Sequence, residues 1–275
     1  MLISMGCPAF AADAKPIDKG QRVFSAGHSF HMFMPKMLTE LAKAAKIPDH
    51  QQAGLSSIGG SYVYQHWNVA DEKNTLKTAL REGKVDVLTL SPIYLPDDGI
   101  ENFAKLGLEH NPGIRVTIQE FWLPFDVFDV NYKKKKPDPV DRNARTVAEL
   151  RSINEPYYKS MDDHVRALNQ KFGKNAVFVV PVGQASLALR AKIIAGEAPG
   201  LKQQNDLFTD AIGHATPPLQ WLTAYCHFAV IYRRSPVGLL CPAALGNLAD
   251  GEALNRLLQQ LAWDAVKAHP LSGLR

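Results

Sequence analysis

The 275-residue chain contains no apolar run that approaches the roughly 20 residues of a membrane-spanning helix, so we expect no membrane span. It also lacks a strong charge bias, because 31 Lys and Arg against 27 Asp and Glu leave a net charge of +4. The basic residues are spread along the chain, which argues against a nucleic-acid partner. Hydrophobic residues make up 46% of the sequence and charged residues 21%, and this composition indicates a folded globular protein.

Cysteine is also scarce. The chain has only Cys7, Cys226 and Cys241. An oxidising compartment would permit a disulfide between the last two. Bridging requires their Cα atoms to lie close together, and two buried free thiols are the alternative interpretation.

The start of the chain has the pattern of a shortened export signal. Residues 1–10 are apolar, and small residues around Ala11 fit a signal cleavage site. The basic segment that normally precedes such a run is missing, which indicates a truncated or misassigned start. We therefore interpret residues 1–14 as a residual export signal or a disordered N-terminus, and we expect an exported protein, periplasmic or secreted.

Short apolar segments alternate with segments of helical periodicity along the rest of the chain. We predict strands near residues 22–27, 53–58, 85–90, 114–122 and 176–181. We predict helices near residues 35–46, 71–82, 100–109 and 146–172, with two or three more after the last strand. This alternation predicts an α/β fold, a flavodoxin-like three-layer α/β/α sandwich of about five parallel strands. No repeat or linker is evident, so residues 15–275 are expected to form one domain.

Polar residues follow the carboxyl ends of the predicted strands, where such folds place their functional loops. Ser29 follows the first strand, and Asp210 and His214 lie close together in the C-terminal region. A serine nucleophile needs a base to take its proton, and the base needs a carboxylate to orient it. These residues are therefore the candidate nucleophile, orienting acid and general base.

Each of the three residues also has a purely structural interpretation. Ser29 could be a helix N-cap, although Pro35 predicts that the next helix begins several residues later. His214 could be a polar loop residue, and Asp210 could cap a turn. Thr216 and the two prolines after it predict the start of a helix, which places His214 in the loop just before that helix.

The order of these segments resembles that of the SGNH (GDSL-like) hydrolases. Residues 23–30, Val-Phe-Ser-Ala-Gly-His-Ser-Phe, look like the first motif of that superfamily. Gly60, in the pair Gly59-Gly60, is similar to the glycine of the second motif, and residues 210–214 resemble the last motif. Residues 225–239 resemble the tail of a divergent bacterial branch of the superfamily.

The resemblance implies ester hydrolysis through an acyl-enzyme, without a metal or organic cofactor. It also implies that backbone N–H groups of Ser29 and Gly60 bind the oxyanion that forms during acyl transfer. For exported members it suggests a carbohydrate O-acetyl ester, small or polymeric, as the substrate.

The sequence departs from the family pattern at three points. His28 stands where the first motif has Asp, and Ser91 follows the third predicted strand where the family offers an oxyanion-binding Asn. Ser91 would have to donate through its hydroxyl, and loss of one oxyanion donor can cost about 3 kcal/mol of transition-state stabilisation. Asp210 and His214 are four positions apart, whereas the family usually has three. These departures leave open a catalytically silent SGNH-like domain that binds a glycan or a protein.

Histidine and aromatic residues near the predicted loops are candidate substrate contacts. The aromatic residues could stack on sugar rings or pack in the core. The histidines, including His214, could instead ligate the metal of a metal-dependent hydrolase, but such a site needs three or four converging ligands, and we predict none. The predicted substrate contacts are His28, His31, Tyr62, His66, Trp67 and Trp122.

Overall fold

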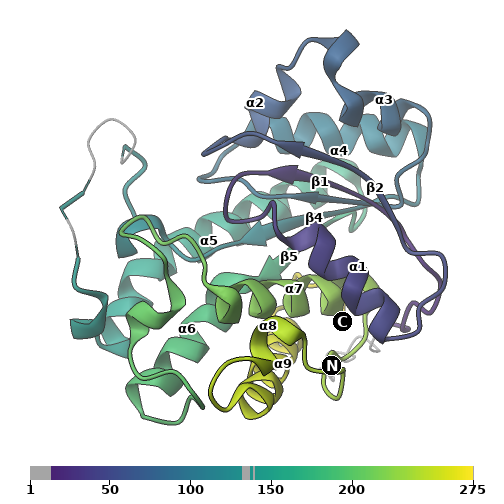
Figure 1. The fold of residues 1–275 in the computed structure, drawn as a ribbon. Helices are drawn as coiled ribbons and strands as arrows, with labels where there is room; N and C mark the ends of the chain where they lie inside the picture. Colours follow the sequence, from purple (N-terminus) through teal and green to yellow (C-terminus); the bar gives the residue numbers. More distant parts are fainter. Residues whose placement is uncertain (1–13, 132–136, 139, 275) are drawn as a thin grey trace, which may run out of the picture.

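The computed structural model describes residues 14–131, 137–138 and 140–274, so the predicted export signal lies outside the described residues apart from Ala14. The described chain contains one sheet of five parallel strands in the order β2-β1-β3-β4-β5 (Figure 1). The strands are β1 (Arg22–Gly27), β2 (Gln51–Ser57), β3 (Val87–Leu90), β4 (Arg115–Glu120) and β5 (Val177–Pro181). The predicted α/β fold and its five parallel strands are confirmed.

Helices cover both faces of the sheet (Figure 1). On one side lie α1 (Met34–Ala44) and α7 (Pro217–Tyr232), with α8 (Ala243–Gly246) and α9 (Gly251–Ala268) packed beyond them. On the other side lie α2 (Val63–Trp67), α3 (Thr75–Arg81), α4 (Asp98–His110) and α5 (Val147–Phe172). The helix α6 (Val182–Ile194) follows β5 and packs against α5, α7 and α9. Short 3-10 helices are η1 (Asp71–Lys73), η2 (Pro124–Asp126), η3 (Arg142–Ala144) and η4 (Gln204–Leu207).

The burial of the strands follows their position in the sheet. Every residue of β3 and β5 is buried, and both strands are apolar along nearly their whole length, as expected where helices cover both faces. The edge strand β2 is mostly exposed and begins with two glutamines. The predicted polar helix 71–82 is divided into η1 and α3, because the side chain of Asn74 accepts a hydrogen bond from the N–H of Lys77 and caps α3 there.

Two helix starts decide where the candidate site lies. The helix α1 begins at Met34 with Phe33 as its N-cap, so Ser29 is not a helix cap but belongs to the preceding turn. The helix α7 begins at Pro217 with Thr216 before it, as predicted. Nearly all of α7 is buried, because it packs against α1, α6 and α9 as well as β5.

The ends of β1 and β3 approach each other closely at Gly27. A Cβ atom at this position would lie 2.9 Å from Cβ of Ser91 and 3.1 Å from Cβ of His31. Only glycine leaves room for this approach without a shift of its neighbours. The turn that carries Ser29 is therefore packed directly onto the end of β3.

Cys226 and Cys241 are free thiols in this structure, so the disulfide alternative is not formed. Cys226 is buried in α7, where burial raises the pKa of its thiol. Among the residues with described structure, no helix combines the length and the apolar character needed to cross a membrane.

Candidate active site

Ser29, His214 and Asp210 meet in one hydrogen-bonded chain beyond the carboxyl end of β1. Oγ of Ser29 lies 2.9 Å from Nε2 of His214, and Nδ1 of the same ring lies 2.6 Å from Oδ2 of Asp210. We assign the Nδ1–H tautomer, because the ionised carboxylate can only accept. Nε2 is then the atom that accepts from the serine hydroxyl. This is the arrangement in which a hydroxyl, an imidazole and a carboxylate can pass a proton in sequence.

The loop between η4 and α7 brings Asp210 and His214 together despite their four-residue spacing. Its two ends pair through an isolated antiparallel bridge between Phe208 and Ala215. Gly213 has a φ of 104°, a left-handed conformation that glycine adopts without strain. The tight loop thus returns the histidine ring to the carboxylate that precedes it.

The carboxylate of Asp210 is held by three donors. Oδ1 accepts from the N–H groups of Gly213 (2.9 Å) and His214 (3.1 Å), and Oδ2 accepts from the imidazole of His214. Burial acts to raise the pKa of Asp210, but these hydrogen bonds outweigh it and hold the pKa below its ordinary value. Asp210 is therefore ionised at neutral pH and oriented toward the ring.

The base and the acid of this cluster are accessible from the surface, and Ser29 is partly exposed. The side chains of His214 and Asp210 are 39% and 44% exposed. A cavity of about 690 Å³ lies beside Ala14 and Leu274, and its lining includes Arg233 and Trp263 but none of the three residues of this cluster.

No protein-family profile and no curated protein matches the chain. Among solved structures, a DUF4886 family protein from Bacteroides uniformis is 14% identical with a TM-score of 0.55, over 94% of this chain and 100% of that chain. A "putative GDSL-like lipase" from Parabacteroides merdae is 14% identical with a TM-score of 0.44, over 76% of this chain and 94% of that chain.

The first of these likenesses establishes a shared fold, and the second is too weak to carry an argument. The α/β fold predicted from the sequence therefore agrees with the first of these structural neighbours.

His28, which stands where the first SGNH motif has Asp, contacts the residues at the ends of β3 and β4. Its Nδ1 accepts a hydrogen bond from the N–H of Phe30 (3.3 Å), so the neutral ring carries its proton on Nε2 and donates to Oγ of Ser91 (3.3 Å). Both His28 and Ser91 are buried. His28 thus orients the hydroxyl of Ser91, and the oxyanion role of Ser91 stays a prediction.

Gly60 also stays a predicted oxyanion donor. It lies in the turn after β2 with a φ of 58°. Gly27 at the end of β1 is paired with Ser57 at the end of β2, and this pairing brings the two loops to the same edge of the sheet.

His31 lies in the core, contrary to the prediction that it contacts the substrate. Its side chain is fully buried, with Nδ1 2.8 Å from Oε1 of Gln119 and Nε2 3.0 Å from Oγ1 of Thr89. Burial lowers its pKa to about 4. The turn after Ser29 winds back, with the N–H of His31 donating to the carbonyl of His28, and this turn aims the ring inward.

The prediction that His66 contacts the substrate is wrong for the same reason. It is 1% exposed, and its two ring nitrogens each lie 2.7 Å from a hydroxyl, those of Ser56 and Ser61. Burial lowers its pKa to about 4. Its ring connects β2 to α2 and offers no free nitrogen to a ligand.

The predicted aromatic contacts have different surroundings. Trp67 packs edge-on against Phe103, and Nζ of Lys77 lies 4.3 Å from its ring centroid, so it belongs to the packing of α2 on α3 and α4. Tyr62 stacks on Tyr64 and is partly exposed, so it remains a candidate contact.

Trp122 is 3% exposed and stacks on Phe30 with 4.7 Å between ring centroids. Its Nε1 donates to the carbonyl of Gly213 (2.7 Å). Trp122 therefore supports the loop that carries His214, and the prediction that it contacts the substrate is corrected.

No group of three or more His, Cys, Asp or Glu side chains in the described ranges is arranged to hold a metal ion. The histidines considered for a metal site therefore give no geometric support to a metal-dependent hydrolase.

Sequence reasoning missed one residue that contacts the candidate site. Arg142 lies in η3 and donates hydrogen bonds to the backbone carbonyls of Asp210 and Ala211. It follows a long irregular connection with no periodic pattern, so nothing in the sequence pointed to it.

Proposed function

We propose that the chain is an SGNH-type serine ester hydrolase, with Ser29 as nucleophile, His214 as general base and Asp210 as the acid that orients the ring. The observation that carries the proposal is the continuous contact from hydroxyl to imidazole to carboxylate, with separations of 2.9 and 2.6 Å. Ser29 and His214 are 185 residues apart in the chain, and hydrogen-bond distances of this kind are what general-base activation of a serine requires.

The reaction would proceed in two acyl-transfer steps. Oγ of Ser29 attacks the ester carbonyl carbon while its proton passes to Nε2 of His214. The C–O bond to the alcohol then breaks, and the imidazolium gives this proton to the departing oxygen. Water next loses a proton to His214 and attacks the acyl carbon, and Ser29 regains the proton as the acid leaves. The oxyanion of each step would be bound by the N–H groups of Ser29 and Gly60 and by the hydroxyl of Ser91.

A carbohydrate O-acetyl ester is the substrate class that we propose, on the basis of the resemblance to exported SGNH proteins. Two features of the site fit a large substrate: the exposure of His214 and Asp210, and the partly exposed Tyr62 stacked on Tyr64 beyond Gly60. An aromatic surface of this kind can stack on a sugar ring. Export to the periplasm or the medium is part of the same proposal.

A serine-directed fluorophosphonate probe tests the function without knowledge of the natural ester. We expect covalent labelling of the wild-type protein and no labelling of Ser29→Ala. Ser57→Ala is the matched control, because Ser57 is an exposed serine at the end of the adjacent strand β2 and should label like the wild type. Release of acetate from acetylated oligosaccharides, lost in Ser29→Ala, would then identify the substrate class.

A catalytically silent binding domain is the second candidate. The feature that favours it is Ser91, which stands in place of the oxyanion-binding Asn, is 1% exposed and has its oxygen bonded to His28. A wild-type protein that the probe does not label, but that binds an acetylated glycan, would favour this candidate over the hydrolase.

A further inference from the structure

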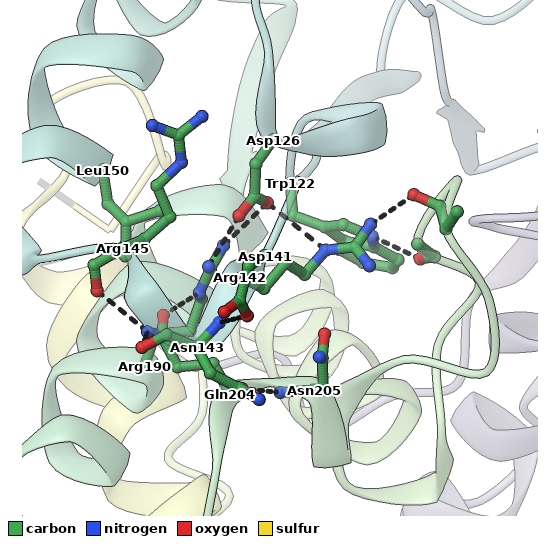
Figure 2. A network of polar contacts seen from close by, with 12 residues as sticks. Trp122, Asp126, Asp141, Arg142, Asn143, Arg145, Leu150, Arg190, Gln204 and Asn205 are labelled. Atoms are coloured by element: carbon green, nitrogen blue, oxygen red, sulfur yellow. Dashed lines mark hydrogen bonds and ion pairs between the residues drawn. The ribbon is translucent and has the colours of Figure 1, made fainter. Parts of the chain in front are cut away.

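The loop that carries Asp210 and His214 is held from outside by Arg142. Nη1 of this arginine donates to the carbonyl of Asp210 (3.1 Å), and Nη2 donates to the carbonyl of Ala211 (2.6 Å) (Figure 2). The planar guanidinium is suited to two such bonds at once. These two hydrogen bonds therefore fix the backbone at Asp210, which orients the proposed general base.

Two further donors extend this contact along the loop. The N–H of Phe125 donates to the carbonyl of Ile212 (3.1 Å), and Nε1 of Trp122 donates to that of Gly213 (2.7 Å). Together with the bonds from Arg142, four consecutive carbonyls of the loop, those of residues 210–213, accept from the connection between β4 and α5. The side chains of the proposed acid and base are partly exposed, so these backbone contacts supply much of what fixes their position.

A buried charge cluster holds Arg142 in place. Asp126 accepts two hydrogen bonds from Arg190 (2.8 and 2.7 Å), and Nε of Arg142 lies 3.6 Å from the same carboxylate (Figure 2). All three residues are 4% exposed. One carboxylate thus faces two guanidinium groups, and the loop carbonyls supply the remaining acceptors that a buried arginine requires.

Gly213 shows that the loop and its support are fitted to each other. A Cβ atom at this position would lie 3.2 Å from Nη2 of Arg142 and 3.4 Å from Nε1 of Trp122. Glycine therefore serves both the left-handed turn of the loop and the close approach of the two donors.

We propose that Arg142 and Trp122 are positioning residues that keep the carboxylate of Asp210 against Nδ1 of His214, so that the ring presents Nε2 to Ser29. The inference rests on the proposed function, because it assigns this contact a role in the acyl transfer. Hydrogen bonds to the loop backbone thus act beside the edge-on contact between the rings of His214 and Phe30 to set the geometry of the base. Displacement of a catalytic group by about 1 Å can cost roughly 100-fold in rate.

The test compares Arg142→Ala with Arg145→Ala. The first variant removes both carbonyl donors and leaves Asp126 paired with Arg190, so no buried carboxylate loses its only partner. Arg145 is three residues away and points away from the cluster (Figure 2), so its removal controls for loss of a positive charge in the same segment. Arg142→Lys keeps the charge but not the planar fork.

We expect the rate of fluorophosphonate labelling at Ser29 to fall about 100-fold in Arg142→Ala and Arg142→Lys, and to be unchanged in Arg145→Ala. The tautomer of His214, measured by long-range ¹H–¹⁵N NMR correlations, is a second measurement. If Arg142 had only a structural role, its removal would leave this tautomer unchanged. We expect the Nδ1–H form in the wild type and in Arg145→Ala, and a shift toward the Nε2–H form in Arg142→Ala.

A folded Arg142→Ala protein with wild-type labelling and the wild-type tautomer would overturn the inference. If Arg142→Ala does not fold, Trp122→Phe decides, because it removes a single donor to Gly213 and should lower the labelling rate about 10-fold, whereas an unchanged rate would refute the role. If the wild type is not labelled, the proposed hydrolase fails, and the tautomer comparison still decides whether Arg142 orients the ring.

Discussion

His31 lies two residues after Ser29 in the chain, and His214 contacts Ser29 in space, but the two histidines have opposite surroundings. His214 is partly exposed, with one nitrogen against a carboxylate and the other against the serine hydroxyl. His31 is fully buried, with its nitrogens against the amide oxygen of Gln119 and the hydroxyl of Thr89. The ring of His214 is thus accessible to a ligand, whereas the ring of His31 is held neutral in the core.

The comparison shows that the partners of a histidine, rather than its distance in sequence from a nucleophile, decide what it can do. A carboxylate partner stabilises the protonated ring that general-base catalysis produces, whereas an amide oxygen in a buried site does not compensate for the loss of hydration. Burial accordingly lowers the pKa of His31 to about 4.

The largest effect should come from removing the imidazole that joins Ser29 to Asp210. We expect His214→Ala to lower the rate of ester hydrolysis and of probe labelling by roughly 10⁴-fold or more, because the serine loses the group that accepts its proton. The free energy of unfolding should change by less than about 0.5 kcal/mol, since the side chain is partly exposed. Acetate release and thermal unfolding measure the two quantities.

Labelling of His214→Ala at the wild-type rate would show that another group activates Ser29. His110→Ala is a suitable control, because His110 is an exposed histidine at the end of α4 and its removal should change neither quantity.

Much of the fold and the three proposed catalytic residues could be predicted from the sequence. The strands were recognisable because β1, β3, β4 and β5 are short apolar runs between segments of helical period, and parallel strands bring their carboxyl ends to one edge of the sheet. Ser29 lies directly after such a strand, so its place in the site followed from the fold.

Side-chain direction and long-range support could not be predicted in the same way. His31 lies two residues after Ser29, but the turn that follows the serine aims it into the core. Arg142 contacts the loop of Asp210 across a separation of 68 residues, from a connection with no periodic pattern. Neither a residue's neighbours in sequence nor its hydrophobic pattern carries this information.

The next largest effect should be acid destabilisation through the buried histidines. The pKa values of His31 and His66 are lowered by burial to about 4, whereas the unfolded value is about 6.5. Their contribution to stability is therefore fully present above about pH 6.5 and is lost as the pH falls toward 4. We expect the two residues together to cost roughly 4 kcal/mol of unfolding free energy between pH 7.5 and 5.

Urea unfolding as a function of pH measures this loss. In His31→Ala the loss of unfolding free energy over this range should be about 2 kcal/mol smaller than in the wild type, the share of one such histidine. The variant should also be less stable at every pH, because Gln119 and Thr89 lose a partner. An unchanged loss would mean that His31 is not buried in its neutral form.

The smallest effect concerns two carboxyl groups, Glu120 and Asp210, which differ in burial as the two histidines do. Glu120 ends β4, is fully buried and accepts hydrogen bonds from the N–H and the side-chain amide of Gln184. Burial raises its pKa to about 7, whereas the donors around the partly exposed Asp210 hold the pKa of that carboxyl below its ordinary value. The buried carboxyl therefore contributes its full stability below its unfolded pKa of about 4.5, and this contribution is lost as the pH rises through 7.

Glu120→Gln keeps an oxygen for the N–H of Gln184 but cannot ionise. Relative to the wild type, the variant should gain about 2 kcal/mol of unfolding free energy between pH 5 and pH 8, because only the wild type must bury a charge at the higher pH. Asp210→Asn is the matched control and should gain nothing over this range, since a carboxylate with a lowered pKa is already ionised at both values. Thermal unfolding at the two pH values decides: if Glu120→Gln and Asp210→Asn respond alike, burial does not separate the two carboxyl groups.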